Sequence, residues 1–271
     1  MADEALMMPA PRSKRAPVSA NWRIAAAVLV VVGVVGLLAT RGVVDGLGSP
    51  VVAKYRNSGL QQQRIELSDG SVVHLDAGSS LNVQMGRSER RLELVAGRAY
   101  FEVAHDASRP FAVTAAGTET VALGTRFEIA LAGQAASVTL AQGSVAISND
   151  THGSHWRAIL RPGEQLKFDV SSGQRETHRV DAEAALSWSE GRLQFAGAPL
   201  GDALEEINRY TGVKIRLGDA TLAATPIGGT FVAGSDSEQI AEALAAAIPL
   251  RIVHVGAGEL VLFQRYATAA N

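Results

Sequence analysis

Apolar and polar residues alternate with a period of two between residues 58 and 185, in short runs separated by turns that contain glycine. The runs at 65–67 and 73–75, for example, flank the pair Asp69-Gly70. An Asp-Gly pair between two alternating runs is typical of a β-hairpin, in which every second side chain faces the core. Similar runs recur at 92–94, 99–103, 127–131, 138–140, 145–147 and 166–168. We therefore predict an all-β antiparallel domain of short strands at residues 58–185, either a sandwich or a stacked β-layer structure.

The apolar period changes after Trp188 from that of strands to that of a helix. The first helical stripe consists of Leu200, Ala203, Leu204 and Ile207, at i, i+3, i+4 and i+7. Pro199 and Gly212 flank the stripe, as is typical of helix ends. Alternating runs at 193–195 and 213–217 enclose this helix, and a second unit follows with a strand at 227–232, a capping box at 235–238, a helix at 240–248 and strands at 250–255 and 259–263. We therefore predict a small α+β domain with two βαβ-like halves at residues 186–266, followed by a tail at 267–271.

Residues 24–40 form a long uncharged run bounded by Arg23 and Arg41. At 1.5 Å per residue a helix of this length spans about 25 Å, and the flanking tryptophan and arginines can anchor it at the membrane interfaces. Basic residues are more frequent before the run than directly after it, which places the N-terminus in the cytoplasm. We therefore predict a single-pass membrane protein with a cytoplasmic tail at 1–23, a transmembrane helix at 24–40 and a linker at 41–57.

A cleaved signal peptide is the alternative interpretation of this run. The apolar stretch of a signal peptide is ordinarily about 7 to 15 residues long and ends at a small-x-small cleavage site. The run in this chain has 17 residues, and residues 37–41 offer no such site, so we favour the membrane anchor. Either interpretation exports the remainder of the chain, so both predicted domains are expected outside the cytoplasm.

Composition excludes several classes of function. The 271 residues include 25 basic and 27 acidic side chains, a net charge of −2, so a nucleic acid is not an expected partner. The chain has no cysteine, which excludes disulfides, thiolate metal sites and a cysteine nucleophile. His152 and His155 lack a third ligand nearby, and His105 and His178 are isolated, so we expect no metal site and no cofactor. Because no hydrolase, zinc-protease or P-loop motif occurs, we expect no enzyme acting on another molecule.

Several short motifs in the exported part are found together in one known family. In chain order they are Leu67-Ser68-Asp69-Gly70-Ser71, Gly97-x-Ala99-Tyr100-Phe101-Glu102-Val103-Ala104-His105-Asp106, Arg109-Pro110-Phe111, Leu123-Gly124-Thr125-x-Phe127, Pro162-Gly163-Glu164 and Trp188-x-x-Gly191-Arg192-Leu193-x-Phe195. With these motifs the chain resembles the FecR family of membrane regulators over about residues 60–265. The part that begins at Pro199-Leu200 resembles the secretin and TonB short N-terminal fold, which closes these proteins.

The resemblance implies an inner-membrane protein that regulates an extracytoplasmic-function sigma factor. Such a protein receives its signal in the periplasm from the signalling domain of a TonB-dependent outer-membrane receptor, commonly an iron-siderophore transporter. Members of the family usually hold the sigma factor through a helical cytoplasmic domain. Only 23 residues, prolines among them, precede the apolar run, so we expect that domain to be missing. The alternative is a membrane-anchored periplasmic scaffold or interaction module that binds no sigma factor.

The pair Gly124-Thr125 is a candidate site of self-cleavage. Glycine is the least hindered acyl donor, and a threonine hydroxyl that is strained onto the preceding carbonyl can accept the acyl group. The resemblance adds that some relatives are cut at a Gly-Thr pair in this context. The alternative is a simple turn before a strand, and the further pairs Gly117-Thr118 and Gly229-Thr230 show that the dipeptide is common.

A partner-binding surface is predicted on the polar side of the first C-terminal helix. Its residues are Asp202, Glu205, Glu206 and Arg209. The alternative is an ordinary solvated face, with acidic residues favoured near the helix N-terminus. An open sheet edge in the same domain is a second candidate, because it can accept a strand from the receptor. The sequence does not decide between the helix face and the sheet edge.

Overall fold

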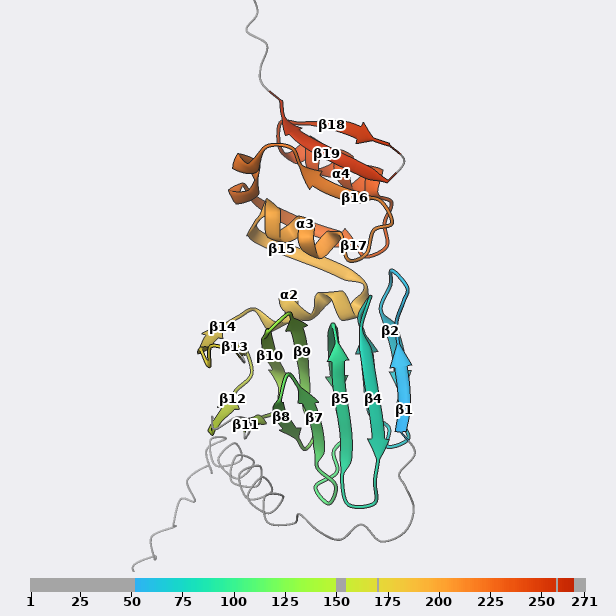
Figure 1. Ribbon diagram of the computed structural model, residues 1–271, viewed down its shortest axis with the longest axis vertical. Helices are drawn as coiled ribbons and strands as arrows, with labels where there is room; N and C mark the ends of the chain where they lie inside the picture. The colour runs from blue at the N-terminus through green and yellow to red at the C-terminus, as the bar shows by residue number, and fades with distance from the viewer. Residues whose placement is uncertain (1–51, 150–154, 170, 257, 266–271) are drawn as a thin grey trace, which may run out of the picture.

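The computed structural model describes residues 52–149, 155–169, 171–256 and 258–265. Within these residues the chain forms two domains stacked end to end, a larger β-domain and a smaller C-terminal domain (Figure 1). The described helices are short, and none of them is long and apolar enough to cross a membrane. The predicted membrane helix at 24–40 and the predicted tail at 267–271 lie outside the described residues.

The β-domain consists of two seven-stranded sheets within the described residues. In spatial order the first sheet contains β1 (Val52–Arg56), β4 (Ser80–Met85), β5 (Arg90–Ala96), β7 (Phe111–Ala115), β8 (Thr118–Ala122), β11 (Val145–Asn149) and β12 (Trp156–Leu160). The second contains β14 (Arg175–Arg179), β13 (Glu164–Asp169), β10 (Ala135–Gln142), β9 (Arg126–Ala132), β6 (Arg98–Glu102), β3 (Val72–Leu75) and β2 (Gln63–Glu66). Described neighbours pair antiparallel except β5 and β7, which run parallel. The prediction of a mainly antiparallel β fold is confirmed.

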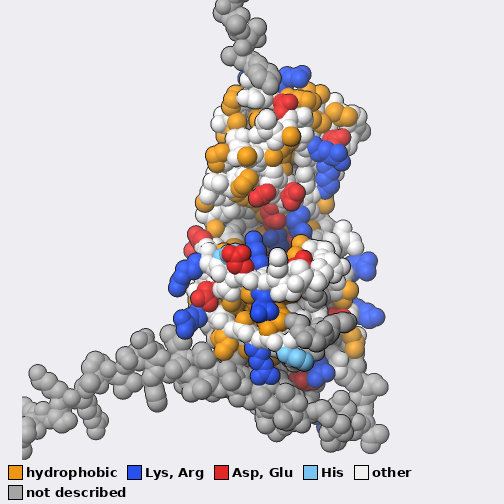
Figure 2. All heavy atoms as spheres, turned by 60° about the vertical axis from the view of Figure 1, so that its left-hand side comes forward, with side chains coloured by type: hydrophobic (Ala, Val, Ile, Leu, Met, Phe, Trp, Pro, Cys, Tyr) orange, Lys and Arg blue, Asp and Glu red, His pale blue; other side chains and the backbone are white. Residues whose placement is uncertain are grey.

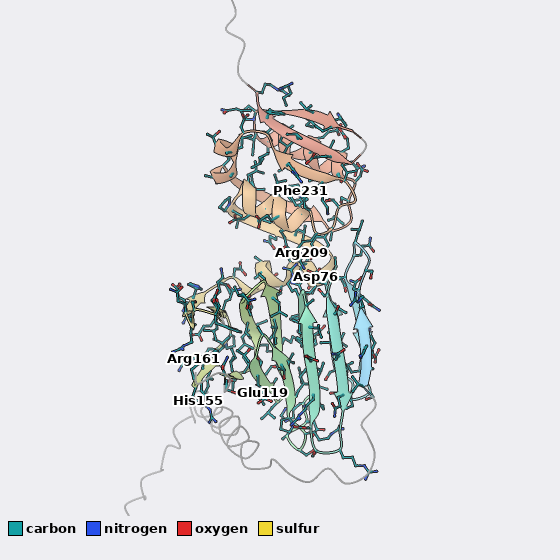
Figure 3. The ribbon with its side chains drawn as sticks, in the orientation of Figure 1. Asp76, Glu119, His155, Arg161, Arg209 and Phe231 are labelled. Carbon is teal, nitrogen blue, oxygen red and sulfur yellow. The ribbon has the colours of Figure 1, made fainter. Side chains whose placement is uncertain are left out.

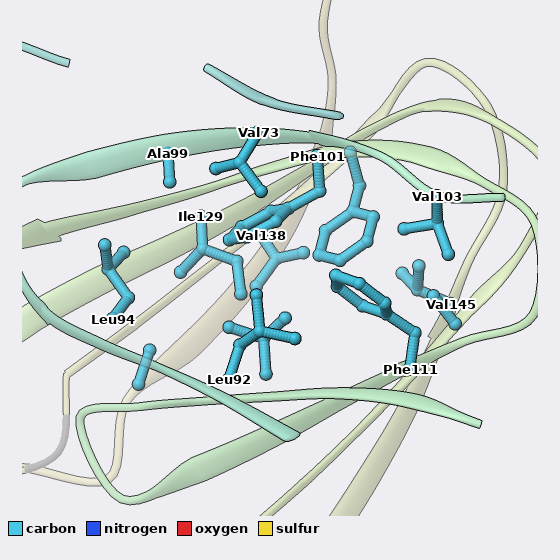
Figure 4. Packing of buried hydrophobic residues seen from close by; sticks show 14 of the residues in the cluster. Val73, Leu92, Leu94, Ala99, Phe101, Val103, Phe111, Ile129, Val138 and Val145 are labelled. Carbon is cyan, nitrogen blue, oxygen red and sulfur yellow. The ribbon is translucent and has the colours of Figure 1, made fainter. Parts of the chain in front are cut away.

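The core of the β-domain lies between the two sheets (Figure 4). Phe101 stacks on Phe127 at 5.1 Å between ring centroids and meets Phe111 edge-on at 5.9 Å. The alternating residues named by the sequence pattern, such as Val73 and Leu75, are fully buried. Alternation predicts these positions because successive side chains of a strand point to opposite faces of the sheet.

The strand β1 occupies part of the stretch that the sequence pattern assigns to a linker at 41–57. Among the described residues β1 is an edge strand that pairs with β4 alone, and its side chains alternate between exposed and half-buried positions. Because no side chain of β1 is fully buried, its five residues show no clear alternation of apolar and polar positions that would predict a strand. In Figure 1, β1 begins at the end of the β-domain that faces away from the C-terminal domain.

The C-terminal domain begins after a short helical connection, α2 (Ala182–Leu186) and the 3-10 helix η1 (Ser187–Glu190). Its elements are β15 (Arg192–Pro199), α3 (Leu200–Ile207), β16 (Lys214–Leu217), the 3-10 helix η2 (Ala220–Ala224), β17 (Pro226–Val232), α4 (Ser237–Ala247), β18 (Leu250–Val255) and β19 (Glu259–Gln264). The strands form a two-stranded sheet β15-β17 and a three-stranded sheet β16-β19-β18. The predicted order of strands and helices is observed, but the predicted βαβ-like halves are not. The strands β15 and β16, which flank α3, lie in different sheets, and so do β17 and β18, which flank α4.

The predicted helical stripe is the buried face of α3, which contacts β15 and β17. The helix ends are displaced slightly from the pattern. Pro199 is the N-cap of α3, and the N-cap of α4 is Asp236, whose carboxylate accepts a 2.8 Å hydrogen bond from the backbone N–H of Glu238. Asp236 takes this position because a short carboxylate side chain reaches the free N–H groups of the first turn.

Candidate functional sites

The two domains meet at a cluster of charged and aromatic side chains, which we call the junction cluster. It consists of Asp76, Arg98 and Glu128 from the β-domain, Trp188 from η1, Glu206 from α3, and Arg209 and Tyr210, which directly follow the C-cap of α3. Asp76 and Arg209 lie across the domain boundary from one another (Figure 3). Figure 2 shows acidic and basic side chains close together at the level where the domains meet.

Asp76 is the central acceptor of the junction cluster. It lies in the turn between β3 and β4 and is fully buried. Its Oδ2 atom accepts hydrogen bonds from Arg98 Nε at 2.9 Å and from Arg209 Nη2 at 2.8 Å. Its Oδ1 atom accepts from the Tyr210 hydroxyl at 2.7 Å and from the backbone N–H of Ala77 at 2.8 Å. Both oxygens of this carboxylate are therefore satisfied, and two of the donors come from the other domain.

Arg98 connects the remaining members of the cluster. Its Nη2 atom donates to Glu206 Oε1 and to the hydroxyl of Tyr210, each at 2.6 Å. Its guanidinium lies 4.3 Å from the ring centroid of Trp188, in cation–π geometry. Burial by itself lowers the pKa of Arg98, but the carboxylates of Glu128, Glu206 and Asp76 outweigh it and raise that pKa, so the side chain stays charged.

Glu128 is buried beside Arg98 and accepts a 2.5 Å hydrogen bond from Trp188 Nε1. Burial raises the pKa of Glu128 above 4.5, against the opposing effects of Arg98 and Trp188. The cluster thus sets the carboxylates of Asp76, Glu128 and Glu206 against two guanidinium groups. The carboxylates of Glu206 and Asp76 therefore add to the effect of burial and also raise the pKa of Glu128.

The predicted partner-binding residues divide into two pairs in the structure. Asp202 and Glu205 are exposed on α3. Glu206 and Arg209 instead face the β-domain, where they bind Arg98 and Asp76. The helical period places all four on the polar side of the helix, but it does not reveal that half of this side is covered by another domain.

Gly124 and Thr125 lie in the turn between β8 and β9. Gly124 has a φ of +150°, and a Cβ atom at this position would lie 2.8 Å from His105 Nδ1. A Cβ atom at Gly143 would lie 2.8 Å from Thr125 Cγ2 and 3.1 Å from the Gly124 carbonyl oxygen. Glycine is therefore required at positions 124 and 143, because a side chain at 124 would collide with His105 and one at 143 would collide with Thr125.

The hydroxyl of Thr125 is buried and has no hydrogen-bond partner within the described residues. A cavity of about 350 Å³ opens on this turn, and its lining includes Glu102, His105, Gly124 and Thr125. A buried hydroxyl without a hydrogen-bond partner is unusual, and this one belongs to the residue directly after Gly124. The turn therefore has two features that an N-to-O acyl shift requires, a bare acyl donor and an unoccupied hydroxyl.

The other two Gly-Thr pairs differ from this one. The hydroxyl of Thr118 donates a 2.7 Å hydrogen bond to the carbonyl oxygen of Ala115, so it is already occupied. Thr230 lies exposed in the strand β17. The dipeptide alone does not distinguish the three pairs, but among them only Thr125 has a buried hydroxyl without a hydrogen-bond partner.

The described residues contain no group of histidine and acidic side chains that could hold a metal ion. His155 is exposed, and His152 lies outside the described residues. His178 Nδ1 lies 3.3 Å from Glu176 Oε1 on β14. His105 is exposed as expected, although it also packs against Gly124.

Comparison with known proteins finds one family model that matches most of the β-domain. The model of the FecR family, described as FecR protein, matches residues 54–146, which run from β1 into β11. Two crystal structures of a proposed anti-sigma factor from Parabacteroides distasonis ATCC 8503 share the fold, each with a TM-score of 0.64 and 22% sequence identity. The alignments cover 80% and 79% of this chain and 100% of each of those chains. No curated protein matches the chain.

Proposed function

We propose, from the FecR domain at residues 54–146, that this chain is a membrane-anchored regulator of an extracytoplasmic-function sigma factor. The family match is the observation that carries the proposal. The similarity in fold to a proposed anti-sigma factor supports it, because 80% of the chain exceeds the length of the β-domain and so extends into the C-terminal domain.

The proposed location is the inner membrane, with residues 24–40 as a single span and the N-terminus in the cytoplasm. The charge distribution around this run supports that orientation. The described part of the chain starts with β1, at the end of the β-domain remote from the C-terminal domain (Figure 1). Such an anchor would place the β-domain next to the membrane and present the C-terminal domain farther out in the periplasm.

The proposed partner in the periplasm is the signalling domain of a TonB-dependent outer-membrane receptor, of the type that takes up iron siderophores. The contact is assigned to the C-terminal domain. Asp202 and Glu205 give the exposed side of α3 a negative charge, which favours a basic patch on the partner. The two-stranded sheet β15-β17 offers a second surface, because each of its strands has one edge unpaired within the described residues.

Self-cleavage between Gly124 and Thr125 is proposed as a second activity, favoured by the unoccupied hydroxyl of Thr125. The hydroxyl oxygen attacks the Gly124 carbonyl carbon. The C–N bond then breaks as the hydroxyl proton passes to the departing nitrogen, which leaves an ester and a free amine. Water hydrolyses the ester, so the products are the Gly124 carboxylate and a chain that begins with an intact Thr125.

A transcription reporter tests the proposed function. The promoter controlled by the host's extracytoplasmic-function sigma factor is fused to a reporter, in cells with and without this chain, and with and without the receptor's ligand. We expect deletion of the chain to remove the response to the ligand, and the full-length chain to restore it. A response that is unchanged by the deletion would reject the regulator and favour the periplasmic scaffold.

A further inference from the structure

The two domains have separate apolar cores, and few apolar contacts join them. The core of the β-domain is formed by residues of that domain alone. The core of the C-terminal domain receives from the β-domain only the buried Ala77 and the half-buried Tyr100, within the described residues. Each domain can therefore keep its own core if the two separate, and contacts of another kind must hold them together.

The β1–β2 loop, residues 57–62, makes a second contact with the C-terminal domain. Leu60 Cδ1 approaches Gly212, and Gln61 approaches Gly234, where a Cβ atom would lie 3.0 Å from Gln61 Nε2. Leu60 remains 46% exposed in this position. This loop touches the C-terminal domain, but it buries too little apolar surface to hold the two domains together.

The junction cluster supplies most of the specific contacts between the domains. Arg209 and Tyr210 bind Asp76, and Glu206 binds Arg98, so the α3 end is held by hydrogen bonds and ion pairs. Buried ion pairs repay the cost of desolvation only when their geometry is nearly ideal. Displacing one partner of such a contact is strongly unfavourable, because it leaves an uncompensated buried charge.

We propose that the junction cluster is a latch, whose closed state docks the C-terminal domain on the β-domain and whose open state lets the two domains move apart. Asp76 is its pivot, because it contacts both arginines and Tyr210. Opening of the latch relays binding at the C-terminal domain to the membrane-proximal β-domain. This relay rests on the proposed function, whereas the latch itself does not.

The charge of the cluster supports this role. Burial raises the pKa of Glu128, which is consistent with one carboxylate too many for the two guanidinium groups. Loss of the Asp76 charge would leave Arg209 without its buried counter-charge and the Tyr210 hydroxyl with a weaker acceptor. The α3 end would then lose its strongest connection to the turn after β3.

Distances between spin labels on the full-length chain in lipid nanodiscs test the latch. The chain has no native cysteine, so Thr114→Cys on β7 and Glu242→Cys on α4, both exposed, can be labelled without background. We expect a single narrow distance distribution for the otherwise unchanged chain. In Asp76→Asn the distribution should become at least twice as broad, with unchanged circular dichroism.

Asp69→Asn is the matched control, because Asp69 forms a buried ion pair with Arg90 entirely inside the β-domain, at 2.8 Å. It should leave the distribution narrow. If Asp76→Asn fails to fold, the same distance measurement is made on Arg209→Gln. This variant is expected to fold, because the side chain of Arg209 is only half-buried. Narrow distributions in both folded junction variants, or equal broadening in Asp69→Asn, would overturn the latch.

Adding the unlabelled signalling domain of the receptor to the labelled chain then tests the relay. We expect the distribution to broaden or shift on binding. Binding with an unchanged distribution would overturn the relay and leave the latch intact, and absence of binding would count against the proposed partner instead.

Discussion

The indole nitrogen of Trp188 donates a 2.5 Å hydrogen bond to the carboxylate of Glu128, which precedes it by 60 residues in the chain. Both side chains are buried, so the bond attaches η1 to the outer face of the second sheet, at the point where the C-terminal domain begins. The apolar period of the sequence changes after Trp188, and the structure places this residue at the boundary between the two domains.

Replacing Trp188 by Phe should destabilise the protein. The substitution removes the donor to Glu128 and the best ring for the cation–π contact with Arg98, and we expect a loss of about 2 kcal/mol in the free energy of unfolding. Thermal denaturation of the full-length chain measures the effect. Trp156→Phe, in the edge strand β12, is the control and should cost less. Equal losses in both variants would contradict a special role for Trp188.

The stability of the protein should depend on the protonation of Glu128. Its folded pKa is raised above 4.5, so its contribution to stability is complete below about that pH and declines as the pH rises toward the folded pKa. Glu128→Gln cannot ionise and keeps an acceptor for Trp188. The stability of Glu128→Gln relative to the unchanged chain should therefore increase from pH 5 to pH 8. A difference that does not vary with pH would show that Glu128 does not titrate in this range.

The ion pair between Asp69 and Arg90 should show the opposite pH dependence. Burial by itself raises the pKa of Asp69, but hydrogen bonds from Ser71 and Arg90 outweigh it and hold the pKa below 3.8. This contribution is present above that pH and is lost as the pH falls through the folded pKa. Asp69→Asn should cost about 3 kcal/mol near neutral pH and less near pH 3, measured by urea denaturation. A constant cost across this range would contradict an ionised Asp69.

Self-cleavage at Gly124-Thr125 should yield two fragments that stay together. β8 precedes the cut and pairs with β11, which follows it, while β6 and β9 pair across it in the other sheet. We expect two bands on a denaturing gel, one species on a native gel, and an intact chain in Thr125→Ala. Thr118→Ala, at another Gly-Thr pair, is the control and should be cleaved normally. Persistent cleavage in Thr125→Ala would indicate an external protease.

An alkaline phosphatase fusion tests the topology. Because residues 24–40 are expected to cross the membrane with the N-terminus inside, a phosphatase attached after Asn271 should be exported and active. The same enzyme attached within residues 1–23 should remain in the cytoplasm and be inactive. An inactive fusion after Asn271, with the protein present in normal amount, would contradict the proposed location.

Local patterns predict the elements of this fold better than their arrangement. The alternation around Asp69-Gly70 and the stripe from Leu200 to Ile207 identify strands and a helix, since burial on one face imposes a period. The parallel pairing of β5 with β7 leaves no trace in the alternation, because both directions bury the same side chains. Pairing order depends on contacts between residues far apart in the chain.

The sequence pattern likewise does not predict that the residues of the junction cluster come together. Asp76 and Arg209 are separated by 133 residues, and each alone is typical of a solvated turn or helix end. The family resemblance singles out Gly124-Thr125 among the three Gly-Thr pairs, whose chemistry is otherwise the same. The feature that separates it from the other Gly-Thr pairs, the unoccupied hydroxyl of Thr125, is a property of the folded chain.

Signalling would depend most directly on contact between the C-terminal domain and the signalling domain of the receptor. The decisive measurement is the affinity of the purified full-length chain for that domain. Asp202→Lys with Glu205→Lys on α3 should weaken binding at least ten-fold, whereas Glu66→Lys with Glu176→Lys, an equal change of charge on exposed strands of the β-domain, should not. The opposite pattern, with binding lost only in the β-domain variant, would contradict the assignment of the partner to the C-terminal domain.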